Sequence, residues 1–139
     1  MTQKNSSGKR LITFWIVTGL LLTGMLAGGL SQLLGAEWTA AGFRDLGYPM
    51  YFMHLLGAWK MLGVVVLLVP GYPRLKEWAY AGFFFLMTGA VVSQLAIGAG
   101  LQGIVFQSIY VLLIVASWWL RPASRRFEFK QAPTPQWQL

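Results

Sequence analysis

The residue whose type and position most suggest chemistry is Lys60, which interrupts the apolar stretch LLGAWKMLGVVVLLV. Side chains that donate or accept hydrogen bonds occur in or beside the neighbouring apolar stretches, at His54, Ser93, Gln94 and Gln107. An ammonium among such groups can bind an anionic or carbonyl-bearing molecule, most strongly where the dielectric constant is low. The sequence therefore predicts a ligand-binding site formed by Lys60, His54, Gln94, Gln107 and Ser93.

Other kinds of chemistry have little support. The chain has no nucleophile motif, phosphate-binding loop or paired carboxylates. Its lack of cysteine excludes disulfides, thiolate metal sites and dithiol redox chemistry. One histidine and four carboxylates are few for a metal site, which usually needs three or four converging ligands. We predict no catalytic residue and no metal ligand, and the sequence favours a non-catalytic protein without excluding an enzyme.

Lys60 lies in a predicted helix from about residue 50 to residue 69, which begins after Pro49 and ends before Pro70. A helix of roughly 20 residues is about 30 Å long, the thickness of a bilayer core. An ionisable side chain there costs on the order of 3 kcal/mol, so Lys60 should face protein or water. Gly57 and Gly63, one turn away on either side, would let another helix approach.

The composition predicts an all-α integral membrane four-helix bundle, because 56% of residues are hydrophobic, 11% are charged and the mean hydropathy is +0.56. We predict spans at about residues 11–34, 50–69, 78–97 and 101–120. The first apolar run is longer than a signal-peptide core, although a signal cleaved near Gly35 is the alternative. Gly24 and Gly28 form a GxxxG pattern within it, and the loop at residues 37–49 is expected to lie on the membrane surface as a short amphipathic turn.

The basic residues predict the orientation. Nine of the eleven fall on one side of these spans, and only Arg44 falls on the other. The nine are Lys4, Lys9, Arg10, Arg74, Lys76, Arg121, Arg125, Arg126 and Lys130. The positive-inside rule then gives a cytoplasmic segment at residues 1–10, a transmembrane domain at 11–122 and a cytoplasmic tail at 123–139, in a multi-pass protein of a bacterial cytoplasmic (inner) membrane. The net charge of +7 is better explained by the membrane surface than by nucleic acid.

On this topology the predicted site residues share one layer of the outer half of the membrane. Helix geometry puts the Lys60 ammonium at about 10 Å depth, Gln107 near 9 Å, His54 near 7 Å and Gln94 near 5 Å. If they also share one side of the bundle, they line a polar cavity open to the outer face. The alternatives are a structural Lys60, an interfacial His54, and glutamines that only join helices by hydrogen bonds.

From Phe43 to about Gly98 the chain resembles the DoxX-like family of small four-span membrane proteins, most closely over FRDLGYPMYFMHLLGAWKMLGVVVLLVPGYPRLKEWAYAGFFF. The specific parts are GYP-x-YF, the LLG-x-x-K that carries Lys60, and VPGYPRLKEWAYAGF. In relatives the third span commonly ends with a histidine and then a Gly-Asp pair, whereas this chain has SQLAIGAG, with Gln94 and Ala99. The resemblance implies that any titration at those positions is lost here.

Two functions are compatible with these observations. The preferred one is a non-catalytic membrane protein that binds a lipid-like amphiphile or a partner membrane protein through the layer around Lys60. The alternative, implied by relatives named for a thiosulfate:quinone oxidoreductase, is a membrane subunit of a quinone-linked oxidoreductase, with a quinone oxygen at Lys60. The resemblance also extends to an animal branch with an assembly chaperone for nicotinic acetylcholine receptors. The sequence leaves open the ligand, the partner and whether the chain forms a homo-oligomer.

Overall fold

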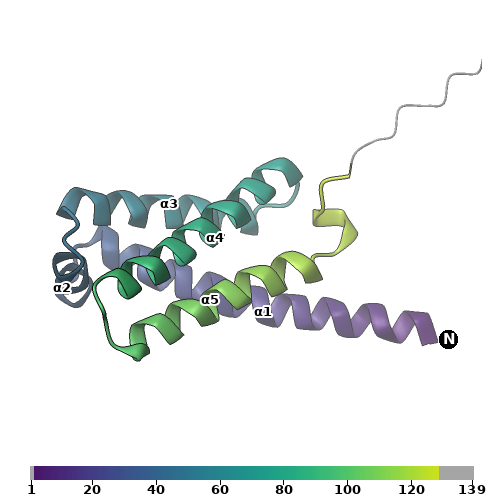
Figure 1. Ribbon diagram of the computed structural model, residues 1–139. Helices are drawn as coiled ribbons and strands as arrows, with labels where there is room; N and C mark the ends of the chain where they lie inside the picture. Colours follow the sequence, from purple (N-terminus) through teal and green to yellow (C-terminus); the bar gives the residue numbers. More distant parts are fainter. Residues whose placement is uncertain (1, 129–139) are drawn as a thin grey trace, which may run out of the picture.

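The computed structural model describes residues 2–128, with side chains described from Ser7 onward. This part of the chain forms five α-helices and a short 3-10 turn, with no strand (Figure 1). The helices are α1 (Thr2–Leu33), α2 (Glu37–Asp45), α3 (Met50–Leu68), α4 (Pro73–Ala96) and α5 (Leu101–Leu120), and the turn is η1 (Ala123–Arg125). The prediction of an all-α protein is confirmed.

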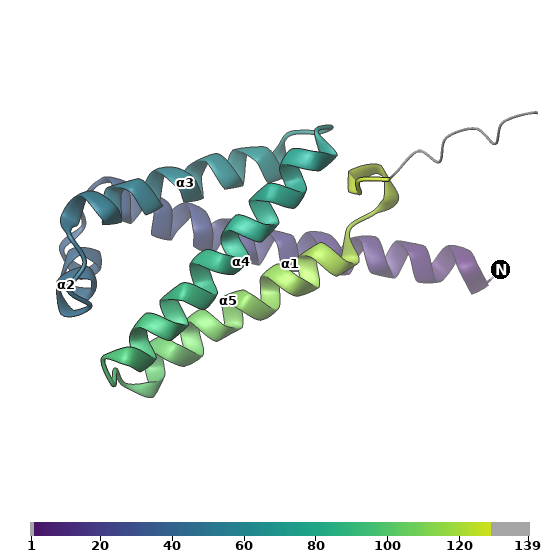
Figure 2. The same ribbon diagram turned by 45° about the horizontal axis from the view of Figure 1, so that its top comes forward.

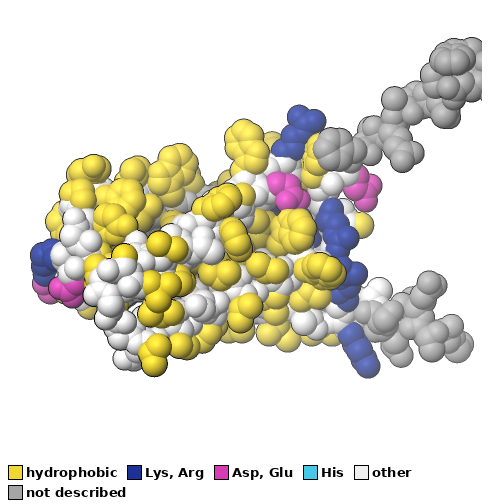
Figure 3. Space-filling model, viewed as in Figure 1, with side chains coloured by type: hydrophobic (Ala, Val, Ile, Leu, Met, Phe, Trp, Pro, Cys, Tyr) yellow, Lys and Arg dark blue, Asp and Glu magenta, His cyan; other side chains and the backbone are white. Residues whose placement is uncertain are grey.

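Four of the described helices, α1, α3, α4 and α5, are long and apolar enough to cross a membrane. Many of their large hydrophobic side chains point outward, among them Ile12, Leu62, Phe85 and Leu112. A surface of this kind is stable in lipid but not in water. Figure 3 shows hydrophobic side chains spread over the middle of the molecule. The chain is therefore a multi-pass membrane protein built as a helical bundle.

The basic side chains gather at the end of the bundle that carries the amino terminus (Figure 3), whereas Arg44 belongs to α2 at the opposite end, where it pairs with Glu37. Arg10 of α1 donates to the Trp119 carbonyl of α5 over 2.9 Å, and Arg125 donates to the Leu67 carbonyl of α3 over 2.9 Å. Ends of α1, α3 and α5 therefore meet there, as the uneven distribution of the basic residues predicted. That this end of the bundle faces the cytoplasm stays a prediction.

Helix boundaries differ from the predicted spans at two places. α1 already begins at Thr2, so the polar amino-terminal residues continue the helix and do not precede it. α4 begins at Pro73, because proline suits the first helical position, and the charged residues after it belong to the helix and not to a loop. The membrane borders within these helices, and the division at residues 10 and 122, stay predictions. Residues 129–139 of the tail, including Lys130, lie outside the described part.

α1 packs against α3 and α5, and α4 packs against α5. α3 and α4 meet at the loop that joins them and diverge from there, as Figure 2 shows. The core between the helices includes Leu21, Met25, Val64, Phe83 and Ile114. At the wide end, α2 lies across the bundle and contacts α1 and α3 (Figure 1). The predicted surface turn at residues 37–49 is thus largely a helix.

Glycines set the closest helix contacts. A β-carbon on Gly57 would lie 2.9 Å from the Leu33 nitrogen of α1, and one on Gly63 would lie 2.6 Å from the Phe83 ring of α4. Gly24 of the GxxxG pattern faces Tyr110 of α5, which leaves no room there for a side chain. The prediction that Gly57 and Gly63 let neighbouring helices approach closely is confirmed.

Candidate functional site

Lys60 lies inside the bundle and is only 7% exposed. Its side chain crosses two glycines of α1: a β-carbon on Gly29 would lie 2.9 Å from the Lys60 β-carbon, and one on Gly28 would lie 3.7 Å from the Lys60 Nζ. Larger residues at Gly28 and Gly29 would crowd the lysine. The predicted orientation of Lys60, away from lipid, agrees with this burial.

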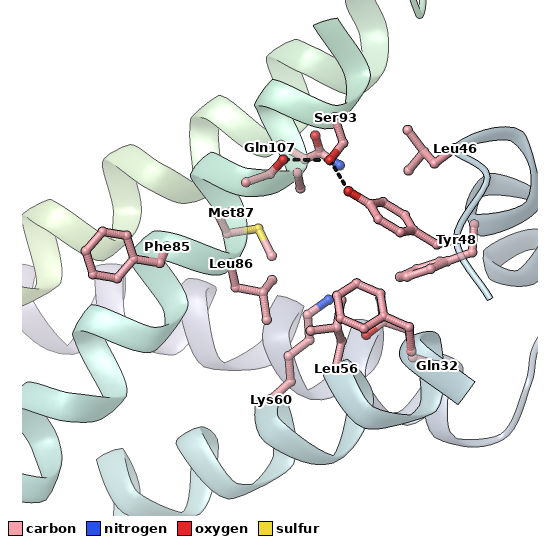
Figure 4. Close-up of a pocket in the computed structure, with 14 residues that line it drawn as sticks. Gln32, Leu46, Tyr48, Leu56, Lys60, Phe85, Leu86, Met87, Ser93 and Gln107 are labelled. Carbon is pink, nitrogen blue, oxygen red and sulfur yellow. Dashed lines mark hydrogen bonds between the residues drawn. The ribbon is translucent and has the colours of Figure 1, made fainter. Parts of the chain in front are cut away.

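The Lys60 side chain borders two adjoining cavities, of about 270 Å³ and about 400 Å³. We refer to them together as the Lys60 cavity. Residues of all five helices line it, and Gln32, Lys60, Met87 and Gln107 line both parts. Figure 4 shows the smaller part, with the Lys60 nitrogen directed between Leu56 and Gln32 toward the space below Tyr48 and Ser93.

Several polar groups of the Lys60 cavity have no partner among the described residues. The side-chain oxygens of Gln32, Thr39 and Gln107 are buried without a hydrogen bond, and all three residues line the larger part. The described residues also give the Lys60 ammonium no hydrogen bond or ion pair. An unsatisfied buried polar group costs about 1–3 kcal/mol, so these four groups together are expensive for a purely structural core. The lining therefore offers one ammonium donor and three side-chain oxygens that other described residues leave without a hydrogen bond.

The charge of the site comes from one residue. Lys60 is the one charged side chain among the described residues that line the cavity. No group of three or more His, Cys, Asp or Glu side chains that could hold a metal ion occurs within residues 2–128. The electrostatics of the cavity therefore favour an anion or a strong hydrogen-bond acceptor over a cation.

The rim is closed by a hydrogen bond between two segments. The Tyr48 hydroxyl, in the connection from α2 to α3, lies 2.7 Å from Ser93 Oγ of α4. Ser93 donates its own proton to the Gly89 carbonyl over 2.9 Å, so Tyr48 is the donor of the pair. Both bonds appear in Figure 4 as dashed lines. The Tyr48–Ser93 bond joins the segment after α2 to α4 beside the cavity.

The structure brings four of the five predicted residues to this place. Lys60 and Gln107 line both parts of the cavity, Ser93 lines the smaller part and Gln94 lines the larger. His54 is exposed and lines neither part. Six residues along a helix correspond to a turn of about 240°, which points His54 about 120° away from Lys60. His54 therefore does not line the cavity, and ligand binding by the predicted site residues stays a prediction.

Sequence reasoning missed Gln32, Thr39 and Tyr48. Gln32 carried a weak signal, because it is an amide near the end of the apolar run of α1. Thr39 and Tyr48 gave none, because they reach the cavity only through the folding of α2 across the bundle.

Comparisons with known proteins bear on the same region. The model of the DoxX-like family matches residues 16–117 of the chain. Comparisons with curated proteins and with solved structures gave no match. The matched range contains every described residue that lines the Lys60 cavity.

Proposed function

Because this chain belongs to the DoxX-like family of membrane proteins, we propose that it binds the polar head of a lipid-like amphiphile in the Lys60 cavity. Membership in the family agrees with the resemblance found from Phe43 to about Gly98 and extends it over most of the chain. The family alone does not supply a function, so the proposal rests on the cavity.

The observation that carries the proposal is a buried ammonium beside three buried oxygens that lack partners. Placing Lys60 within a membrane-spanning helix costs free energy, and such residues are therefore a functional hypothesis by default. Ligand cavities are mostly apolar with a few placed polar groups, in a range of about 300–1,000 Å³. The Lys60 cavity, with parts of about 270 Å³ and about 400 Å³, has this size and character.

The chemistry of the lining supports a head group with an acceptor oxygen. Lys60 donates hydrogen bonds and carries positive charge, so it favours a carboxylate or another acceptor oxygen. Gln32 and Gln107 offer acceptor oxygens, which a hydroxyl of the ligand or a co-bound water would satisfy. On the predicted topology, the ligand comes from the outer leaflet of a bacterial inner membrane, because α2, which lines the cavity, lies at the end opposite the basic residues.

Replacing the cation tests the proposal. Lys60→Met keeps a long apolar side chain and removes the charge, and Lys9→Met makes the same change at an exposed position outside the cavity. Both variants, purified beside the wild type, should give the same gel-filtration profile and helical circular dichroism. Native mass spectrometry should find a bound amphiphile in the wild type and in Lys9→Met, and none in Lys60→Met. Retention of the same ligand by Lys60→Met would overturn the proposal, and a co-purified quinone would support the oxidoreductase subunit.

A further inference from the structure

A second, entirely apolar hollow lies on the outside of the bundle, between α3 and α4. It has a volume of about 480 Å³ and is lined only by aliphatic residues, aromatic residues and glycines. Trp59 and Trp78 are exposed by 59% and 74% and border it, while Phe83 is 3% exposed and lies on its inner side. We call it the α3–α4 groove.

The α3–α4 groove adjoins the Lys60 cavity. Leu56 of α3 and Leu86 of α4 line both the groove and the smaller part of the cavity. Figure 4 shows these two side chains beside the Lys60 side chain. α3 and α4 diverge toward this end of the bundle (Figure 2), so the two leucines stand between the polar interior and the lipid-facing side.

The dimensions of the groove suit one hydrocarbon chain. On α3 its lining runs from Leu56 to Val66. Ten residues of helix correspond to about 15 Å, half the thickness of a bilayer core of about 30 Å. The groove therefore extends along the membrane normal for about the depth of one leaflet, starting beside Lys60 and ending near the loop between α3 and α4.

One glycine of the groove faces open space and the other is packed, because a β-carbon on Gly63 would lie 2.6 Å from the Phe83 ring. Gly63 and Gly82 both line the groove. A β-carbon on Gly82 would meet no other atom within 4 Å, so this position faces open space. Glycine in a helix interior is less stable than alanine. Gly82 therefore costs helix stability although no neighbouring atom requires a glycine there.

We propose that the α3–α4 groove holds the hydrocarbon chain of the amphiphile whose head lies in the Lys60 cavity, and that this ligand is a single-chain, long-chain carboxylate. The inference rests on the proposed function and adds the identity of the tail, the number of chains and the route of entry. The carboxylate enters sideways from the bilayer, past Leu56 and Leu86, and accepts hydrogen bonds from Lys60. The head then lies below the membrane surface, which suits a small carboxylate and disfavours a bulky phospholipid head.

Filling the groove tests the inference. Gly82→Leu adds a side chain in open space within the groove, and Gly19→Leu makes the same change at an exposed glycine of α1 where a β-carbon also meets nothing. Saturable binding of radiolabelled palmitate is measured in nanodiscs, with protein-free nanodiscs as the blank. Gly82→Leu should weaken binding at least tenfold, and Gly19→Leu should bind as the wild type does.

The Lys60→Met variant separates the two proposals in the same assay. If palmitate binding is lost in Lys60→Met but unchanged in Gly82→Leu, the groove assignment is overturned and the head site stands. If Lys60→Met binds palmitate as well as the wild type does, the head site itself fails.

A second measurement on the unaltered chain does not depend on the folding of a variant. Palmitate with a diazirine near its terminal carbon is photolysed with the wild type, with and without excess palmitate, and the labelled peptides are sequenced. Competable label on residues 59–66 and 75–82 supports the inference. Competable label confined to the lipid-facing sides of α1 and α5 overturns it.

Discussion

Gly29 of α1 and Gly57 of α3 meet backbone to backbone, so closely that a β-carbon on Gly57 would lie 2.8 Å from the Gly29 carbonyl oxygen. This contact brings α3 onto α1 three residues before Lys60. It fixes the position from which the lysine extends across α1 into the cavity. Any residue larger than glycine at either position would push the two helices apart.

Gly57→Ala is therefore expected to destabilise the protein. Overpacking of a tight contact costs about 1–3 kcal/mol, because a backbone must shift to admit the methyl group. Thermal unfolding in detergent, followed by tryptophan fluorescence, should show a lower midpoint. Gly19→Ala is the matched control, because its β-carbon meets nothing within 4 Å, and its midpoint should be unchanged or higher. Equal midpoints for Gly57→Ala and the wild type would contradict the close contact.

Glu77 and Arg121 form the ion pair expected to matter most for stability. Arg121 is 4% exposed, and its Nη2 lies 2.6 Å from Glu77 Oε1, while the Trp118 indole donates to Glu77 Oε2 over 2.8 Å. Glu77→Ala leaves the buried guanidinium without its carboxylate, at a cost of about 2 kcal/mol. The same unfolding assay measures the loss.

Glu37→Ala is the control for this prediction. Its partner is Arg44, and the two side chains are 80% and 53% exposed, so the pair is screened by solvent. The change in unfolding midpoint should be small, and smaller still in high salt. If Glu37→Ala lowered the unfolding midpoint as much as Glu77→Ala does, burial of the ion pair would not explain its contribution to stability.

Removing an unsatisfied oxygen from the Lys60 cavity should make the protein more stable and should weaken its binding of the ligand. Gln107→Leu replaces an amide whose buried oxygen lacks a partner, so unfolding without ligand should become harder by about 1 kcal/mol. The same variant should retain less amphiphile in native mass spectrometry. A variant that is both less stable and fully loaded with ligand would show that Gln107 serves helix packing instead.

The orientation of the bundle can be tested with single cysteines, because the chain has none of its own. Trp38→Cys lies on exposed α2, and Ser124→Cys lies at the basic end. A membrane-impermeant maleimide should label Trp38→Cys in intact cells and Ser124→Cys only after permeabilisation. The reverse pattern would place the mouth of the Lys60 cavity on the cytoplasmic side.

Much of the fold could be predicted from the sequence, because bilayer thickness and proline positions restrict where apolar helices begin and end. The inward orientation of Lys60 followed from the cost of a charge in lipid. The position of His54 outside the cavity lining could not be predicted, since depth along a helix fixes the layer of a residue but not the side on which it points. The α3–α4 groove and the rim bond of Tyr48 could not be predicted, because both depend on how helices diverge or fold back.

The walls of the Lys60 cavity come from residues as far apart as Gly24 and Tyr110. During synthesis α3 precedes α4 and α5, so Lys60 is made before two of the helices that line its cavity. A nascent chain interrupted after α3 presents an uncompensated ammonium to lipid, which a complete chain encloses. Enclosure of Lys60 therefore depends on α4 and α5, which supply Met87, Gln94 and Gln107 to the lining, as well as on α3 itself.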